Sequence, residues 1–165
     1  MTDVKGTYEP RFAAVHAALA ESLDKDDVGA SVAVYLDGEP VVDLWGGYAD
    51  ADRSVGWERD TLTGVNSTTK NMTALCALVL ADRGLLELSA PVCAYWPEFS
   101  AAGKERVLVR HVLSHTAGLP ELPGPTAVED LYDWETVTAR LAAQAPAWEP
   151  GTAAGYHALT FGYLR

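Results

Sequence analysis

Hydrophobic residues recur along the first part of the chain at helical spacing and then in two β-rich runs. Between Tyr8 and Leu23 the apolar positions lie three or four residues apart, which predicts an amphipathic helix. Residues 30–36 and 40–45 are rich in β-branched and aromatic side chains, and a short loop containing Gly38 separates them. This pattern predicts a β-hairpin. The chain is therefore expected to open with one helix and two antiparallel strands.

The remaining pattern is mostly helical. A broad apolar face starts after residues 66–70 and ends at Gly84, which predicts a central, buried helix. Cys76 lies on this face and is expected to be a core residue, as free cysteines usually are. Shorter helices are expected at 110–115 and 130–144. The pattern thus predicts an α/β part followed by an all-α part.

These elements suggest a division of the chain into two parts. Residues 1–62 would hold the first helix and the hairpin, and residues 63–165 would form the mostly helical part. An isolated two-stranded hairpin is marginally stable without further strands or a covering helix. We therefore expect the sheet of the first part to be unfinished.

Composition identifies an ordinary globular chain and excludes several classes of partner. The sequence has 165 residues, of which 48% are hydrophobic and 21% charged, and its formal net charge is −11. Because the acidic residues are spread along the chain, we expect no nucleic-acid partner. No apolar run is long enough to be a signal or a membrane span, so we expect a cytoplasmic protein without membrane contact. The two cysteines, Cys76 and Cys93, lack zinc-ligand spacing, and we expect no metal and no cofactor.

Ser67 and Lys70 form a Ser-x-x-Lys motif at the start of the second predicted helix. Residues three apart lie on one helix face, so the hydroxyl and the amine can touch. Burial and the positive end of the helix dipole both disfavour an ammonium group, which makes Lys70 a candidate base. The alternative interpretation is a helix cap next to a surface lysine. A second copy, Ser22 to Lys25, ends the first helix among acidic residues and is expected to be solvated and without function.

Three motifs together resemble the serine β-lactamase-like hydrolases. The Ser-x-x-Lys motif is followed by Arg-His-Val-Leu-Ser-His-Thr-Ala-Gly-Leu-Pro at residues 110–120 and by Gly-Tyr-His at residues 155–157. In this order the chain resembles class C β-lactamases, D-alanyl-D-alanine peptidases and family VIII esterases. The resemblance implies an incomplete β-lactamase/transpeptidase-like fold, with the N-terminal helix, the strand hairpin and most of the helical domain.

The resemblance also implies roles for individual residues. Ser67 corresponds to the serine that becomes acylated, Lys70 to its base partner, and Tyr156 to a tyrosine that relays protons between the serine oxygen and the leaving group. The same resemblance assigns His111 and His115 to a packing and turn element, and we expect both to be structural.

Two departures from the family pattern limit the resemblance. β-Lactamases carry Tyr-x-Asn in the second motif, whereas residues 156–158 read Tyr-His-Ala, which favours an esterase over an antibiotic-degrading enzyme. A third motif, Lys/His-Thr/Ser-Gly or Trp-x-Gly, does not follow Tyr156. Residues 45–47, Trp-Gly-Gly, imitate it at the end of a predicted strand, where we interpret them as a turn feature.

The expected function is a serine hydrolase that cleaves small esters or amides through an acyl-enzyme. One alternative is a catalytically silent fragment that pairs with another chain, either a second copy or a complementing C-terminal piece. A further alternative is a β-lactamase or a D-alanyl-D-alanine carboxypeptidase.

Overall fold

The computed structural model describes residues 3–164, and the chain forms two compact units that join between Gly64 and Val65. Each unit has a hydrophobic cluster of its own. The two units are described separately below, and the candidate functional residues all lie in the second.

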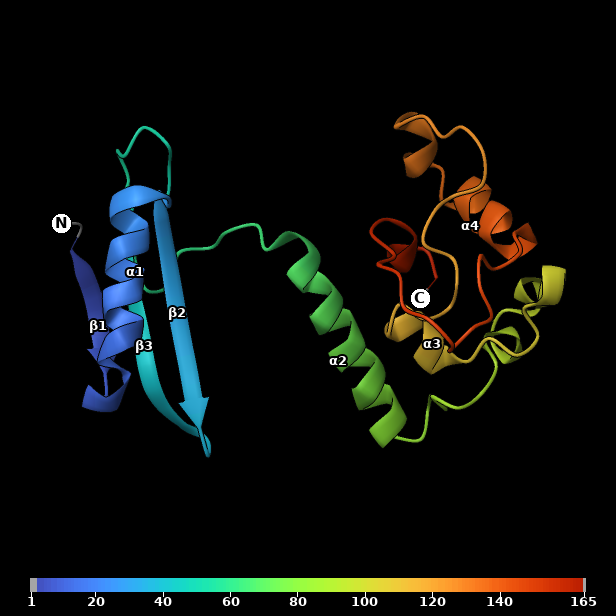
Figure 1. Ribbon diagram of the computed structural model, residues 1–165, viewed down its shortest axis with the longest axis horizontal. Helices are drawn as coiled ribbons and strands as arrows, with labels where there is room; N and C mark the ends of the chain where they lie inside the picture. The colour runs from blue at the N-terminus through green and yellow to red at the C-terminus, as the bar shows by residue number, and fades with distance from the viewer. Residues whose placement is uncertain (1–2, 165) are drawn as a thin grey trace. The chain divides into compact units, whose positions relative to one another are not determined.

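The first unit is a three-stranded antiparallel sheet with one helix packed on it (Figure 1). Its strands are β1 (Val4–Tyr8), β2 (Gly29–Leu36) and β3 (Glu39–Gly47), in the order β1-β3-β2. The helix α1 (Ala13–Lys25) follows a short 3₁₀ turn, η1 (Pro10–Phe12). Leu19 and Leu23 of α1 pack into the cluster formed by three residues of β3, namely Val41, Val42 and Leu44.

The predicted hairpin is confirmed, and its turn explains why. Asp37 and Gly38 join β2 to β3, and both have positive φ angles, 53° and 85°. Two-residue hairpin turns of this kind match the right-handed twist of the flanking strands, and Asp-Gly is a favoured pair for them. The short-range signal in the sequence was therefore sufficient for this element.

The prediction of only two strands was wrong, because β1 pairs with β3 across 34 to 42 residues of sequence, as in Val4 with Gly46 and Tyr8 with Val42. Tyr8 ends β1, and α1 begins only at Ala13, so the first helix starts later than predicted. The Trp-Gly-Gly segment at 45–47 was interpreted as a turn, but it belongs to β3. Trp45 and Gly46 pair with both β1 and β2, and Gly47 pairs with β2.

The second unit is built from helices and 3₁₀ turns (Figure 1). Its α-helices are α2 (Thr69–Asp82), α3 (Val109–Leu113) and α4 (Trp134–Ala143). The 3₁₀ turns are η2 (Asn66–Thr68), η3 (Val92–Ala94), η4 (Pro97–Gly103), η5 (Glu129–Tyr132) and η6 (Thr160–Gly162). The three helices predicted for this region are therefore present, with α4 beginning four residues later than expected.

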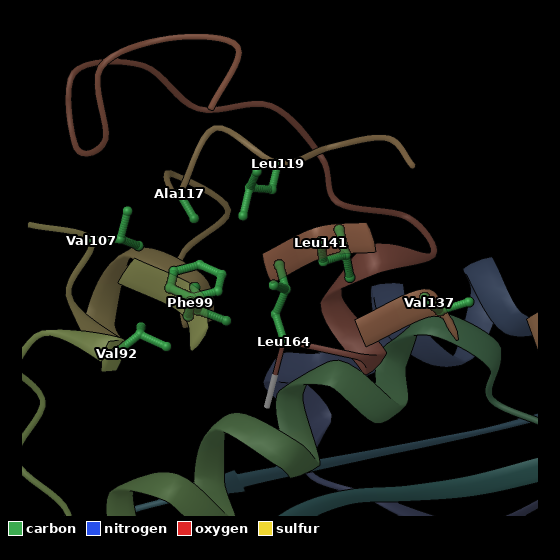
Figure 2. Close-up of a cluster of buried hydrophobic side chains, with 9 residues drawn as sticks. Val92, Phe99, Val107, Ala117, Leu119, Val137, Leu141 and Leu164 are labelled. Carbon is green, nitrogen blue, oxygen red and sulfur yellow. The ribbon is translucent and has the colours of Figure 1, made fainter. Parts of the chain in front are cut away.

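A cluster of buried side chains holds the second unit together (Figure 2). It draws Phe99 from η4, Val112 from α3, and Val137 and Leu141 from α4, and Leu119 joins it from the segment after α3. Phe99, Leu119, Val137 and Leu141 have no exposed surface. Full burial of a large apolar side chain contributes about 1.5 to 3 kcal/mol, so this cluster is the main anchor for the loops around it.

The structure corrects the prediction that the second helix is buried. No residue of α2 is buried, and Cys76, expected in the core, is exposed. Five large apolar residues of α2 are between 40% and 55% exposed: Met72, Leu75, Leu78, Val79 and Leu80. An apolar groove of about 610 Å³ lies beside the helix and is lined also by Val112 and Trp134. Although α2 is apolar, no helix within residues 3–164 has both the length and the hydropathy to cross a membrane.

Candidate active site

Ser67 and Lys70 lie together at the N-terminal end of α2. Ser67 belongs to the 3₁₀ turn η2, and Lys70 is the second residue of the helix that continues it. Asn66 precedes the serine with a φ of 43°, a left-handed conformation that asparagine tolerates better than most residues. The Lys70 Nζ donates a hydrogen bond to the Ser67 Oγ at 3.1 Å. The spacing of the motif therefore produces the contact that the sequence predicted.

Lys70 has three further neighbours, all from the end of the second unit. Its Nζ donates a hydrogen bond to the backbone carbonyl of Ala158 at 2.9 Å. The same nitrogen lies 5.1 Å from the centroid of the Tyr156 ring and 5.7 Å from that of Phe161. Two aromatic faces and a carbonyl oxygen thus surround the amine, an environment that orients it toward Ser67.

Tyr156 is brought to the same place from a segment almost ninety residues away in sequence. Its side chain is 56% exposed. Hydrogen bonding with Ser67 lowers the pKa of the Tyr156 phenol, a hydrogen bond with Lys70 and the positive charge of that lysine lower it further, and desolvation opposes them. The three residues predicted from the motifs therefore meet, with a hydroxyl, an amine and a phenol of lowered pKa in one place.

The second Ser-x-x-Lys copy is not assembled in this way. The Ser22 Oγ donates to the carboxylate of Asp27 at 2.5 Å, and the Lys25 Nζ pairs with Glu21 on the preceding turn. The Lys25 side chain is 63% exposed. The prediction that this copy is solvated is confirmed, so spacing alone does not bring the two groups together.

The loop that carries Tyr156 is attached to the segment after α3. Gly118 has a φ of 80°, and a Cβ at this position would lie 2.8 Å from the carbonyl oxygen of Trp148. The backbone therefore bends at Gly118 in a conformation that favours glycine. The carbonyl of Gly118 accepts from Ala147 N–H at 2.7 Å, and that of His115 accepts from Gly155 N–H at 3.1 Å. These bonds hold the two segments side by side.

Two histidines lie beside the site, His115, which was expected to be structural, and His157, to which the sequence assigned no role. His157 is completely buried, and His115 is half-buried with its ring 4.9 Å from the Tyr156 ring between centroids. Burial lowers the pKa of both rings, and for His115 the charges of His157 and Lys70 lower it further. For His157, the only signal in the sequence was its position next to Tyr156. Within residues 3–164, no three His, Cys, Asp or Glu side chains are grouped to hold a metal ion.

Comparisons with known proteins identify the family to which the chain is similar. The family model described as "Beta-lactamase" matches residues 15–165. Esterase/beta-lactamase LipL of Mycobacterium tuberculosis is 48% identical over 162 residues, which is 98% of this chain and 37% of that protein.

Two solved structures share the fold. A family VIII carboxylesterase is 50% identical with a TM-score of 0.86, covering 98% of this chain and 44% of that one. A penicillin-binding protein homologue from Caulobacter crescentus is 44% identical with a TM-score of 0.90, covering 99% of this chain and 44% of that one. The expected fold, the N-terminal part of a β-lactamase/transpeptidase-like fold, is confirmed. The chain spans less than half of the length of these relatives.

Proposed function

Because this chain belongs to the β-lactamase family, we propose that it carries the nucleophile of a serine hydrolase that cleaves small esters or amides through an acyl-enzyme. One observation supports this most directly, namely the 3.1 Å contact between the Lys70 Nζ and the Ser67 Oγ. A serine hydroxyl is a weak nucleophile until a neighbouring base accepts its proton. The second Ser-x-x-Lys copy lacks such a contact, which supports Ser67 as the reactive one of the two.

In the proposed reaction the Ser67 Oγ attacks the substrate carbonyl while its proton passes to the amine of Lys70 in the neutral form. The tetrahedral intermediate collapses, the bond to the alcohol or amine breaks, and Tyr156 delivers a proton to the leaving group. Lys70 then passes the proton that it took from Ser67 to Tyr156, which returns both residues to their starting forms. Water then attacks the acyl-enzyme, its proton returns to the Ser67 oxygen, and the carboxylic acid leaves. The lowered pKa of Tyr156 supports a part for this phenol in proton transfer.

An ester is the favoured substrate class. The Tyr-x-Asn amide of β-lactamases is replaced by Ala158, whose side chain has no polar atom, and its backbone carbonyl is already occupied by Lys70. One similar protein is described as a family VIII carboxylesterase, and LipL is described as an esterase/beta-lactamase. We therefore expect p-nitrophenyl acetate to be hydrolysed much faster than the β-lactam nitrocefin. A faster reaction with nitrocefin would reverse this choice.

Covalent labelling of the gene product that contains these 165 residues tests the nucleophile. A fluorophosphonate probe should attach to Ser67, as mapped by peptide mass spectrometry, and Ser67→Ala should abolish the label. Ser22→Ala is the matched control, because Ser22 begins the second Ser-x-x-Lys copy. Labelling that survives Ser67→Ala, or that maps to another serine, would contradict the assignment.

A catalytically silent fragment that pairs with another chain is the second candidate function. The exposed apolar residues of α2 favour it, since large apolar patches mark interaction surfaces. Size-exclusion chromatography of the 165-residue chain, combined with the fluorophosphonate probe, separates the two candidates. A labelled monomer supports self-sufficient hydrolysis, and an unlabelled oligomer supports pairing through a second copy or a complementing C-terminal chain.

A further inference from the structure

The segment from Gly155 to Ala158, here called the 155–158 strap, delivers two partners to Lys70. Tyr156 places its ring 5.1 Å from the Lys70 Nζ, and the Ala158 carbonyl accepts a hydrogen bond from the same nitrogen. The strap belongs to no helix or strand, so no ladder of backbone hydrogen bonds fixes its position. Other contacts must hold it in place, because a small displacement would move both partners of the lysine.

His157 supplies two of these contacts from inside the protein. Its Nε2 accepts a hydrogen bond from the Leu119 N–H at 3.0 Å, and its Nδ1 faces the carbonyl oxygen of Gly155. A backbone N–H can only donate and a carbonyl can only accept. Together these partners favour the neutral His157 ring with its proton on Nδ1. A second proton on Nε2 would point at the Leu119 N–H, which is itself a donor, and the hydrogen bond would be lost.

His115 holds the strap from the other side. Its Nδ1 accepts a hydrogen bond from the backbone N–H of His157 at 3.1 Å, and its carbonyl accepts one from Gly155 N–H at 3.1 Å. The acceptor role of Nδ1 again selects a neutral ring, here with the proton on Nε2. The titratable groups that face His115 are Lys70, Tyr156 and His157.

Leu119 connects these contacts to the hydrophobic core. Its side chain is fully buried in the cluster shown in Figure 2. Its backbone N–H donates to His157, and its carbonyl accepts from the Thr160 hydroxyl at 2.6 Å. The strap is therefore fastened on both sides of Ala158 to a residue that cannot move without disturbing the core.

We propose that His115 and His157 form a neutral pair of positioning residues that holds Tyr156 and the Ala158 carbonyl against Lys70. The pair does not touch the reacting atoms, and it acts through the 155–158 strap. This inference rests on the proposed function of Ser67 and Lys70. It adds a condition to that function, because protonation of either ring removes an acceptor and releases the strap.

Steady-state kinetics of the gene product with p-nitrophenyl acetate test the pair. His157→Leu should lower kcat roughly 10- to 100-fold with little change in KM, since misplaced catalytic groups slow the chemical step more than binding. His157→Gln should recover most of the rate, because an amide offers one donor and one acceptor without titrating. His111→Leu is the matched control. His111 is half-buried, lies in the 110–120 segment together with His115, and accepts a hydrogen bond from the Leu108 N–H, away from the strap.

Nitrogen NMR of the imidazole rings gives a readout that does not depend on activity. Both rings should be neutral at pH 7, with the proton of His157 on Nδ1 and that of His115 on Nε2. The inference would be overturned by a cationic ring at neutral pH or by the opposite tautomers. It would also be overturned if His157→Leu left kcat unchanged in protein that is labelled at Ser67. If the fluorophosphonate probe fails to label Ser67 in the protein without substitutions, that result counts against the proposed function instead. The NMR tautomers of His115 and His157 would still test the positioning pair in that case.

Discussion

At the scale of single residues, the candidate site depends on Lys70. The Lys70 Nζ donates hydrogen bonds to the Ser67 hydroxyl and the Ala158 carbonyl, and it lies against two aromatic rings. The Ser-x-x-Lys spacing predicted the first of these contacts because both residues belong to one helical turn. The other contacts come from Tyr156 to Phe161, and only tertiary structure brings that segment to α2. The spacing therefore identified the candidate pair but could not reveal its surroundings.

Lys70→Arg should lower kcat with p-nitrophenyl acetate by at least about 100-fold in the gene product. Arginine retains the positive charge but does not deprotonate in proteins, so it cannot accept the Ser67 proton. Lys25→Arg, in the second Ser-x-x-Lys copy, should leave the rate unchanged. If Lys70→Arg retains most of the activity while the protein is folded by circular dichroism, Lys70 is not the base.

Three histidines should make folding stability depend on pH. Burial lowers the pKa of His111, His115 and His157 in the folded state. In the unfolded chain each titrates near its ordinary value of about 6.5. As the pH falls below that value, the unfolded chain binds protons that the folded protein does not, so the free energy of unfolding decreases. The decrease ends once the pH passes below the folded-state pKa values.

Urea unfolding between about pH 8 and pH 5 checks this prediction. The free energy of unfolding should be constant above about pH 7.5 and should fall as the pH is lowered. The double variant His115→Gln/His157→Gln should show a weaker decrease, because the unfolded chain then gains fewer protons. Asp50 and Asp133 also have lowered pKa values, but they titrate below 3.8 and do not act in this range. Equal stability at pH 8 and pH 5 would contradict the prediction.

At the scale of elements, the sequence predicted the helices and turns that depend on neighbouring residues, and missed the features that depend on distant ones. The hairpin followed from its Asp37-Gly38 turn, and α2 followed from its apolar periodicity. β1 was missed because Val4–Tyr8 is short, contains a glycine, and gains its partner β3 only in the folded chain. The burial of α2 was overestimated because periodicity reports which face is apolar and cannot report what covers that face.

Lys104 completes the end of α4, a role that no sequence pattern indicated. Its side chain is fully buried, and its Nζ donates to the carbonyls of Ala101 at 2.7 Å and Ala142 at 2.8 Å, and to that of Gln144. Carbonyls at a helix C-terminus lack partners within the helix, and a positive charge there is favourable. Burial lowers the pKa of this lysine, but three acceptors surround the amine.

Lys104→Met should lower the free energy of unfolding by about 2 to 4 kcal/mol, because it leaves buried carbonyls without a donor. Lys25→Met is the control, since Lys25 is exposed on α1 and should change stability by less than about 0.5 kcal/mol. Urea denaturation of both variants at neutral pH measures the difference. Equal effects of the two substitutions would show that the buried lysine does not stabilise α4.

At the scale of the whole molecule, the exposed apolar face of α2 is the feature that calls for a partner. Met72, Leu75 and Leu78 are each more than half exposed, and an apolar groove lies beside the helix. Apolar surface of this extent gains free energy when it is covered, at about 25 cal/mol per Å². Scattered single apolar residues are common on protein surfaces, but a continuous helical face is not.

The isolated 165-residue chain should therefore self-associate through α2 and bind the dye ANS. Leu75→Lys should weaken both effects, because a lysine at the centre of the apolar face makes burial of that face unfavourable. With a net charge of −11 on each copy, charge offers little attraction between copies, so the apolar face is the expected source of association. Leu62→Lys is the matched control, since Leu62 is a leucine 97% exposed outside α2. Sedimentation velocity over a range of concentrations gives the association directly. If both lysine variants reduce it equally, charge rather than the apolar face of α2 controls association, and the face requires no partner.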